Sequence, residues 1–410
     1  MVQLRTCVLD ALPLPTHGVN LRGRAHCGNE ADRVSMRYKQ LDSLRGLAAL
    51  VVIVYHCLIT LPQYGLATSG GVEATGALIW ILARTPLHIF VAGTAAVMLF
   101  FVLSGFVLTL ALERASYGYF IFLSQRFIRL FPPFAASILL SAFFYTIVEP
   151  KPLDFVSEWF NFESWTAAPT FAVIAGHLGM VLFGELYTLN NVMWSLVIEM
   201  RVSILFPFIF WLTRKHPCLS LMASFGLMLA SLALGRLHLL PEWVDSWLLT
   251  ARVLWLFVAG GVLAHKRTQV STFISGLNKF SVRMIFIISL LALGFPAGIN
   301  VTIVSSGIGS VLLIGLIIAS PKDFLILEWR PLLYLGKISY SLYLVHLPIL
   351  LIMVHAVAAP DRLTPVLAAG AGCALLAAHI LHFAVERPCH RLARKLSESN
   401  TNSHQGVRSV

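Results

Sequence analysis

The chain has 410 residues, of which 58% are hydrophobic and only 12% are charged, and its mean hydropathy is +0.80. Soluble globular domains carry about twice that share of charge, so the composition excludes that class and predicts an all-α, polytopic transmembrane helical bundle. The net charge of +11 is expected in cytoplasmic loops, where Lys and Arg collect, and does not indicate a nucleic-acid partner. The six cysteines are scattered without metal-ligand or disulfide spacing, so we expect neither a metal nor a bound cofactor.

The first 39 residues, 1–39, are polar and basic and lack the apolar core of a secretory signal. We predict a flexible, basic cytoplasmic tail there. Ten apolar stretches follow that are long enough, or nearly so, to cross about 30 Å of hydrocarbon. They run approximately 44–61, 88–112, 131–148, 194–212, 219–236, 249–264, 283–299, 302–319, 338–356 and 365–384.

The distribution of Lys and Arg decides whether an eleventh, shorter stretch, 170–184, spans the membrane. With the amino terminus inside and this stretch not spanning, most of the 30 Lys and Arg residues fall in inner segments, in keeping with the positive-inside rule. We therefore predict about ten spans with both termini cytoplasmic. The predicted layout is a transmembrane domain at 40–390, an outer loop at 149–193 that holds 170–184 as a re-entrant or interfacial piece, and a short cytoplasmic tail at 391–410.

The first span carries an arginine near its start and a histidine inside it. Arg45 and His56 are eleven residues apart, which is almost three helical turns, so both side chains share a face and the histidine lies roughly 16 Å deeper. An ionisable side chain at that depth indicates a functional site. The alternative is a histidine that bonds a neighbouring helix and serves only packing.

The second and third spans add small residues and two more arginines. Ser104 and Gly105 interrupt an aromatic run in the second span, a pattern typical of close helix packing. At the start of the third span, Arg126 and Arg129 lie at i and i+3 and share a face. Together with Arg45 they would form a phosphate site, because guanidinium groups match phosphate oxygens. The alternative is contact with lipid headgroups.

The outer loop 149–193 is acidic and aromatic, which suits either anchoring at the headgroup level or a mouth for a polar substrate. In the fourth span, Glu199 and Arg201 are two residues apart and point to different sides, so each needs a partner on another helix or in a wet cavity. A structural ion pair is the alternative.

The ninth span carries a polar stripe formed by Tyr340, Ser341, Tyr343 and His346. His382 and Glu386 end the last span, where helix capping explains them.

Six segments in order, LDSLRGLAALVVIVYH, FFVLSGF, RFIRLFPPF, WSLVIE, GKISYSLYLVHLPI and VERP, resemble the acyltransferase-3 family of integral-membrane O-acyltransferases. The resemblance runs from about 40 to 390. The family includes bacterial enzymes that acetylate O-antigen, peptidoglycan and exopolysaccharide, which implies a bacterial inner-membrane location. It also implies that His56 is the catalytic histidine, that Arg126 and Arg129 serve the acyl-CoA, and that the WSLxxE element supplies Trp194, Ser195 and Glu199.

The expected reaction moves an acyl group, acetyl in the simplest case, from cytoplasmic acyl-CoA to a hydroxyl of a glycan or another cell-envelope acceptor. Acyl-CoA is then a co-substrate, and membrane lipid surrounds the protein. His56 is the predicted general base, since its unperturbed pKa leaves it mostly neutral near pH 7, and Glu199 is predicted to orient it. Arg45, Arg126 and Arg129 bind the acyl-CoA. The predicted supporting residues are Asp42, Ser104, Trp194, Ser195, Arg201, Tyr340, Ser341 and His346.

Two alternatives remain open from the sequence. One is a covalent acyl-histidine route in the same enzyme. The other is a secondary transporter or exporter that uses the buried His, Glu and Arg residues as a proton relay. A transporter of that kind predicts interrupted helices at matching places in two halves, and the Gly and Pro interruptions of this chain do not match in that way.

Overall fold

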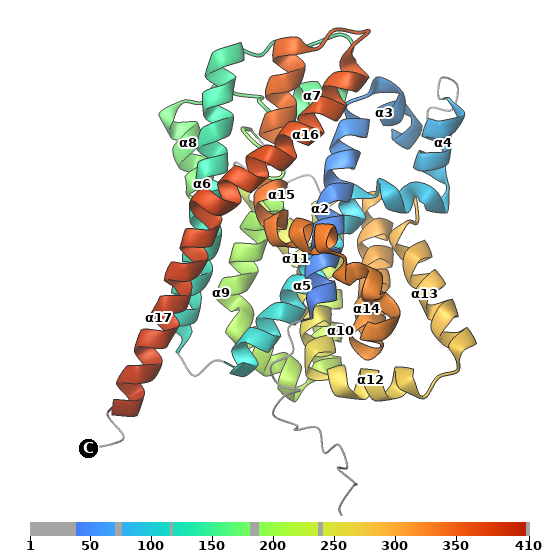
Figure 1. Cartoon of the computed structure of the whole chain (residues 1–410), viewed down its shortest axis with the longest axis vertical. Helices are drawn as coiled ribbons and strands as arrows, with labels where there is room; N and C mark the ends of the chain where they lie inside the picture. The colour runs from blue at the N-terminus through green and yellow to red at the C-terminus, as the bar shows by residue number, and fades with distance from the viewer. Residues whose placement is uncertain (1–37, 70–75, 115–117, 181–187, 237–240, 407–410) are drawn as a thin grey trace, which may run out of the picture. The chain divides into compact units, whose positions relative to one another are not determined.

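The computed structural model of the protein describes residues 38–69, 76–114, 118–180, 188–236 and 241–406. All regular secondary structure in these ranges is helical (Figure 1). The predicted tail at 1–39 lies outside the described residues, except for its last two positions. Lys39 begins the first long helix.

Nine helical runs within the described ranges are long and apolar enough to cross a membrane. They are α2 (Lys39–Ile59), α5 (Gly93–Arg114), α6 (Tyr119–Val148), α9 (Met193–Lys215), α10 (Pro217–Gly235), α11 (Glu242–His265), α14 (Ile299–Ala319), α15 (Arg330–Val357), and α16 (Leu363–Leu381) with its continuation into α17 (Arg387–Gly406). The protein is therefore an integral membrane protein of the all-helical class.

The stretch predicted as the seventh span, 283–299, is shorter than expected. It forms α13 (Lys279–Leu293), which has 15 residues and is about 22 Å long at 1.5 Å per residue. The helix ends at Leu293, and Gly294 and Pro296 follow; proline cannot continue the intrahelical hydrogen bonds. The tenth span and the cytoplasmic location of both termini thus remain predictions.

The remaining helices are short. They are α3 (Pro62–Ser69), α4 (Ala77–Arg84), η1 (Pro86–Phe90), α7 (Glu158–Phe162), α8 (Phe171–Leu178), α12 (Arg267–Ser275) and η2 (Pro321–Glu328). Of the stretch 170–184, the described part forms the eight-residue α8, about 12 Å long. The second span begins at Gly93 rather than at 88, because η1 occupies Pro86–Phe90.

The last span does not end before Pro388. A π-helical segment, His382–Glu386, joins α16 to α17, and the helix runs on to Gly406. Proline in a regular α-helix clashes with the carbonyl group four residues earlier, and the wider π turn relieves that clash. The segment predicted as a short tail, 391–410, is thus helical as far as Gly406.

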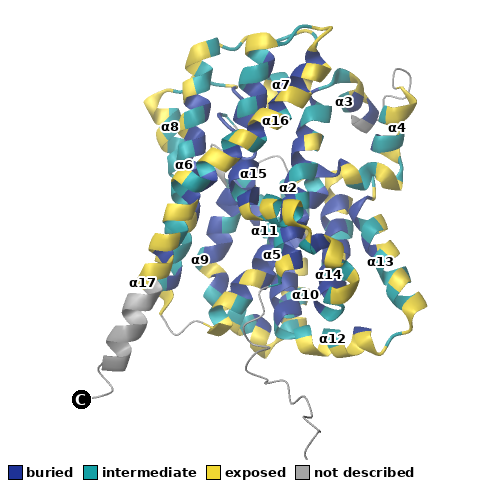
Figure 2. Ribbon diagram, in the orientation of Figure 1, coloured by how far each residue is buried: buried dark blue, intermediate teal, exposed yellow. Residues whose placement is uncertain are grey.

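Helix α2 lies in the centre of the bundle, against α15 and α5, and α5 packs in turn on α11 (Figure 1). Helices α6 and α17 run side by side at one edge, and α13 and α14 at the other. Glycines permit the closest approaches: Gly46 of α2 faces Gly336 of α15, and Gly105 of α5 faces the backbone of Phe257 on α11. The predicted close packing at Gly105 is confirmed. Buried residues concentrate on α5, α9, α11, α14 and α15 (Figure 2).

Candidate active site

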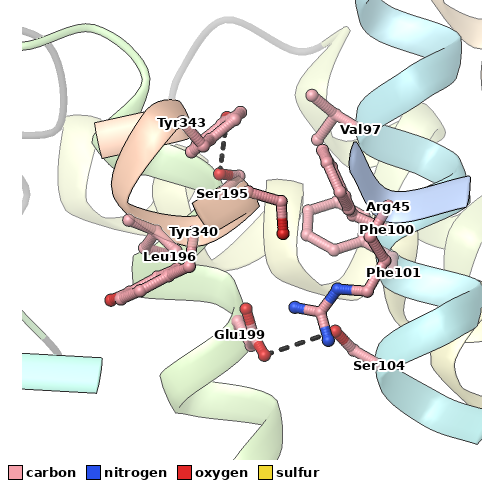
Figure 3. Close-up of a pocket in the computed structure, with 11 residues that line it drawn as sticks. Arg45, Val97, Phe100, Phe101, Ser104, Ser195, Leu196, Glu199, Tyr340 and Tyr343 are labelled. Carbon is pink, nitrogen blue, oxygen red and sulfur yellow. Dashed lines mark hydrogen bonds between the residues drawn. The ribbon is translucent and has the colours of Figure 1, made fainter. Parts of the chain in front are cut away.

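A cavity lies beside the first turns of α2. Its cavity volume is about 30 Å³. Helices α2, α5, α9 and α15 each contribute to its wall (Figure 3). The lining residues are Arg45, Val97, Phe100, Phe101, Ser104, Ser195, Leu196, Glu199, Ser339, Tyr340 and Tyr343. Aromatic and aliphatic side chains form most of the wall, and the charged groups of Arg45 and Glu199 lie with Ser104 at one end.

The structure brings the three predicted arginines together at that end. Arg126 Nη2 lies 2.7 Å from Glu199 Oε1, and Arg126 Nε donates a hydrogen bond to Ser203 Oγ at 3.3 Å. Arg129 lies within electrostatic reach of Arg45, Arg126 and Glu199 and keeps an exposed surface. The Nε of Arg45 is buried without a hydrogen-bond partner among the described residues. Three positive charges face two nearby carboxylates, Glu199 and Glu386, which leaves this end of the cavity with an excess of positive charge.

Glu199 belongs to the arginine end of the site. Its Oε1 accepts hydrogen bonds from Arg126 Nη2 and, at 3.3 Å, from Ser104 Oγ. The sequence suggested that Glu199 orients His56, but the structure gives His56 a different partner. The reason is axial position: His56 lies in the last turn of α2, almost three turns beyond Arg45, whereas Glu199 lies beside Arg45.

The partner of His56 is His346 on α15. Their ring nitrogens, His56 Nδ1 and His346 Nε2, are 3.0 Å apart. His56 is 9% exposed and His346 is fully buried. The other nitrogen of His346, Nδ1, lies 3.1 Å from the carbonyl oxygen of Leu342, one turn earlier in the same helix. His346, predicted only as a supporting residue, is therefore in direct contact with the predicted base.

The loop 149–193, predicted to lie on the outer side, contacts His56 through α7. The ring of Trp159 lies 5.2 Å from the His56 ring, tilted by 32°. Ser157 fixes α7 to the end of α2: its Oγ donates to the carbonyl oxygen of Ile59 at 2.6 Å, and its backbone N–H donates to that of Thr60 at 2.9 Å. Trp159 was not singled out from the sequence, in which it is one of several loop aromatics, and no local pattern distinguishes it.

Tyr343 connects the cavity to the histidine pair. Its hydroxyl lies 2.8 Å from Ser195 Oγ and 3.2 Å from the carbonyl oxygen of Val192. Its ring lies 5.9 Å from the His346 ring. The predicted polar stripe on α15 thus runs from the cavity wall to the histidine pair. Tyr340, also in the wall, donates to the carbonyl oxygen of Leu130 on α6 at 2.7 Å.

Ser341 faces away from the cavity. Its Oγ donates to Glu386 Oε2 at 2.6 Å, and His382 Nδ1 lies 3.0 Å from the same oxygen. These contacts join α15 to the π-helical segment, so His382 and Glu386 do more than cap a helix end.

Arg201 also lies outside the site. It donates to Ser246 and Thr250 on α11 and stacks on Trp247. The prediction that Glu199 and Arg201 find partners on other helices is confirmed. Asp42 lies in the first turn of α2, and Trp194 packs edge-on against Phe101, a cavity residue. In the part of the chain that the structure describes, no group of three His, Cys, Asp or Glu residues is arranged to hold a metal ion.

These features define a membrane-embedded helical protein with a cationic cavity at one end of its central helix and a buried histidine pair at the other. The chain belongs to the acyltransferase-3 family: the family model, described as an acyltransferase domain, matches residues 38–382. That match contains every residue of the cavity and both histidines, and it supports a membrane acyltransferase activity. Comparison with curated proteins found no match, and comparison with solved structures found none.

Proposed function

We propose that this protein transfers an acyl group, acetyl in the simplest case, from cytoplasmic acyl-CoA to a hydroxyl of a glycan or another cell-envelope acceptor. The observation that carries the proposal is the pairing of two sites on one helix. Arg45 marks the cationic end of the cavity and His56 lies almost three turns further along α2. A CoA thioester has the same layout, with phosphates at one end and a reactive carbonyl at the end of a long arm.

The arginine cluster supports the donor part of the proposal. Of the three arginines in the cluster, only Arg126 forms a hydrogen bond to Glu199 in the described structure. The guanidinium groups of Arg45 and Arg129 are not held in this way. Guanidinium groups bind phosphate oxygens with short, charge-assisted hydrogen bonds. The apolar wall, which includes Phe100, Phe101 and Leu196, suits the uncharged arm of CoA. Under the predicted topology this end faces the cytoplasm, where acyl-CoA is made.

The histidine pair supports the chemical part. In the proposed reaction, His56 takes the proton from the acceptor hydroxyl as its oxygen attacks the thioester carbonyl. The tetrahedral intermediate then collapses, the C–S bond breaks, and the proton passes from His56 to the leaving sulfur, so that the products are an O-acyl ester and free CoA. General-base assistance of this kind is worth about 10²–10⁴-fold in rate.

The outer loop supports an acceptor that arrives from the opposite side. Trp159 and α7 lie over His56, and this loop is the predicted outer mouth. An acceptor hydroxyl entering there meets His56 from one face while the acyl-CoA arm approaches from the other. The proposed setting is the bacterial inner membrane, with an envelope glycan as acceptor.

The donor part is tested by binding. Protein in nanodiscs is titrated with acetyl-CoA as wild type, as Arg45→Gln, as Arg129→Gln and as the control Arg214→Gln, which removes an exposed charge at the carboxyl end of α9. We expect the two cavity variants to weaken binding at least about tenfold, roughly one lost charge-assisted contact, and the control to bind like the wild type. Equal affinities in all four proteins, or no binding by folded wild type, would contradict the proposed donor site.

A further inference from the structure

The contacts of His346 determine which nitrogen of each histidine carries the proton. The carbonyl oxygen of Leu342, 3.1 Å from His346 Nδ1, can only accept a hydrogen bond, so Nδ1 carries the hydrogen. A neutral imidazole has one N–H group, which leaves His346 Nε2 as an acceptor. His56 Nδ1, 3.0 Å away, must then donate to it. The remaining nitrogen of His56, Nε2, is left with its lone pair.

The opposite polarity is unfavourable for a neutral pair. If His346 Nε2 donated to His56 Nδ1, the lone pair of His346 Nδ1 would face the Leu342 oxygen at hydrogen-bond distance, which places two acceptors against each other. A charged pair would avoid this conflict, but an uncompensated charge at a fully buried position is costly, and His346 has no exposed surface. The neutral pair with the proton on His56 Nδ1 satisfies every contact that the two rings make with each other and with Leu342.

The backbone around His346 is fixed by contacts that do not involve its ring. Pro348 lies inside α15 and lacks the N–H that would otherwise bond the carbonyl oxygen of Leu344. That oxygen instead accepts hydrogen bonds from Ser137 Oγ at 2.9 Å and Asn190 Nδ2 at 3.1 Å. Polar partners of this kind are what permit a proline within a membrane helix. They hold the turn that carries His346 against α6 and the start of α9.

We infer that His346 is a positioning residue: by accepting the hydrogen bond from His56 Nδ1–H, it holds His56 in the tautomer whose Nε2 is free to act as the base. This inference rests on the proposed function. When His56 Nε2 takes the proton of the acceptor hydroxyl, the bond from Nδ1 to His346 becomes charge-assisted and stronger. The role is that of the acid in a Ser–His–acid triad, which fixes the tautomer and orientation of its histidine, here performed by a neutral imidazole.

Two variants of His346 separate positioning from packing. Leu fills a similar space without an acceptor, whereas Gln offers an amide oxygen near the place of Nε2. In nanodiscs with acetyl-CoA and an envelope-glycan extract, we expect His346→Leu to lower kcat at least about 100-fold and to keep the Kd for acetyl-CoA within about twofold. His346→Gln should regain at least tenfold of the lost kcat. The control His379→Gln, an exposed histidine of α16, should match the wild type.

The tautomer itself is measured by ¹⁵N NMR of histidine-labelled protein, with His56→Ala used to assign the His56 signals. We expect a protonated Nδ1 and an unprotonated Nε2 for His56 in the wild type. This measurement needs neither an acceptor nor a variant of His346. A His56 ring with its proton on Nε2, or a kcat for His346→Leu within a few fold of wild type, would overturn the inference. Equal loss in the Leu and Gln variants would also overturn it. Turnover at the wild-type rate in His56→Ala would instead refute His56 as the base of the proposed reaction, and would leave the tautomer assignment standing.

Discussion

Arg126 Nη2 lies 2.7 Å from Glu199 Oε1, so the first arginine of the Arg-x-x-Arg pair is bound to the α9 helix, whereas Arg129, one turn later, forms no hydrogen bond to another described residue. The two arginines, which lie one helical turn apart, therefore have different roles. Arg126 ties α6 to α9 and keeps Glu199 neutralised. Arg129 keeps an exposed surface within electrostatic reach of Arg45, Arg126 and Glu199.

This difference predicts that the same substitution has different effects at the two positions. Arg126→Gln leaves Glu199 at a site where only 14% of its side chain is exposed, so we expect a loss of about 1–3 kcal/mol of stability, the cost of a poorly compensated polar group. Arg129→Gln should leave the unfolding temperature unchanged and weaken acetyl-CoA binding. Thermal unfolding and acetyl-CoA titration of both proteins in one detergent separate the two effects. Equal destabilisation by both variants would contradict the assignment.

The contact between α2 and α15 sets the height of the histidine pair, and it depends on glycine. A methyl group added at Gly336 would meet the backbone carbonyl of Asp42, which cannot move without shifting α2. We expect Gly336→Ala to lower stability by about 1–3 kcal/mol, the usual cost of overpacking, and to reduce activity because Arg45 and His56 shift together. Gly372→Ala on α16, where no atom lies within 4 Å of the new methyl, is the matched control for thermal unfolding. Unfolding temperatures that agree between the two variants would show that the helix contact is looser than described.

The position of Trp159 predicts that its loss diverts the acyl group from the acceptor hydroxyl to water. Its ring packs against the His56 ring, and in the proposed mechanism it would keep bulk water from His56. We expect Trp159→Ala to raise CoA release in the absence of acceptor several-fold, because water then competes as the nucleophile. Phe162→Ala removes a 66% exposed aromatic of the same short helix and should behave like wild type. Acceptor-free hydrolysis that is unchanged in Trp159→Ala would argue that another group shields His56.

The predicted orientation is tested by labelling of exposed positions. Single cysteines at Lys151, in the loop 149–193, and at Lys279, at the start of α13, replace exposed side chains in a background without the six native cysteines. We expect a membrane-impermeant thiol reagent to label position 151 in intact cells and position 279 only after the membrane is opened. The reverse pattern would invert the assignment of the arginine cavity to the cytoplasm.

The sequence predicted the parts of this site that depend on a single helix. Helical periodicity placed Arg45 and His56 on one face and Arg126 with Arg129 on another, and the structure puts the three arginines together as expected. Apolar length located most of the spans. These features follow from local geometry and composition, which the sequence contains directly.

The pairing of side chains between helices was not predictable in the same way. His346 and Glu199 were both polar residues inside apolar spans, and the sequence alone favoured Glu199 as the partner of His56. The outcome depends on the relative height of α15 and α9 beside α2, and the Gly46–Gly336 contact fixes α15 against α2. The continuation of the last helix past Pro388 escaped prediction for a related reason, since the π turn that permits it leaves no mark in the sequence.

The central claim is that His56 is the general base of acyl transfer. Its most direct test is a single-turnover measurement in nanodiscs, with [¹⁴C-acetyl]-CoA bound to wild type and to His56→Ala and with an envelope-glycan extract as acceptor. Both proteins are loaded with the same amount of bound donor, so that only the chemical step differs. The proposed mechanism predicts label in the glycan and free CoA for the wild type, and a rate at least about 100-fold lower for His56→Ala. Transfer at the wild-type rate by His56→Ala would contradict the role of His56 as the base.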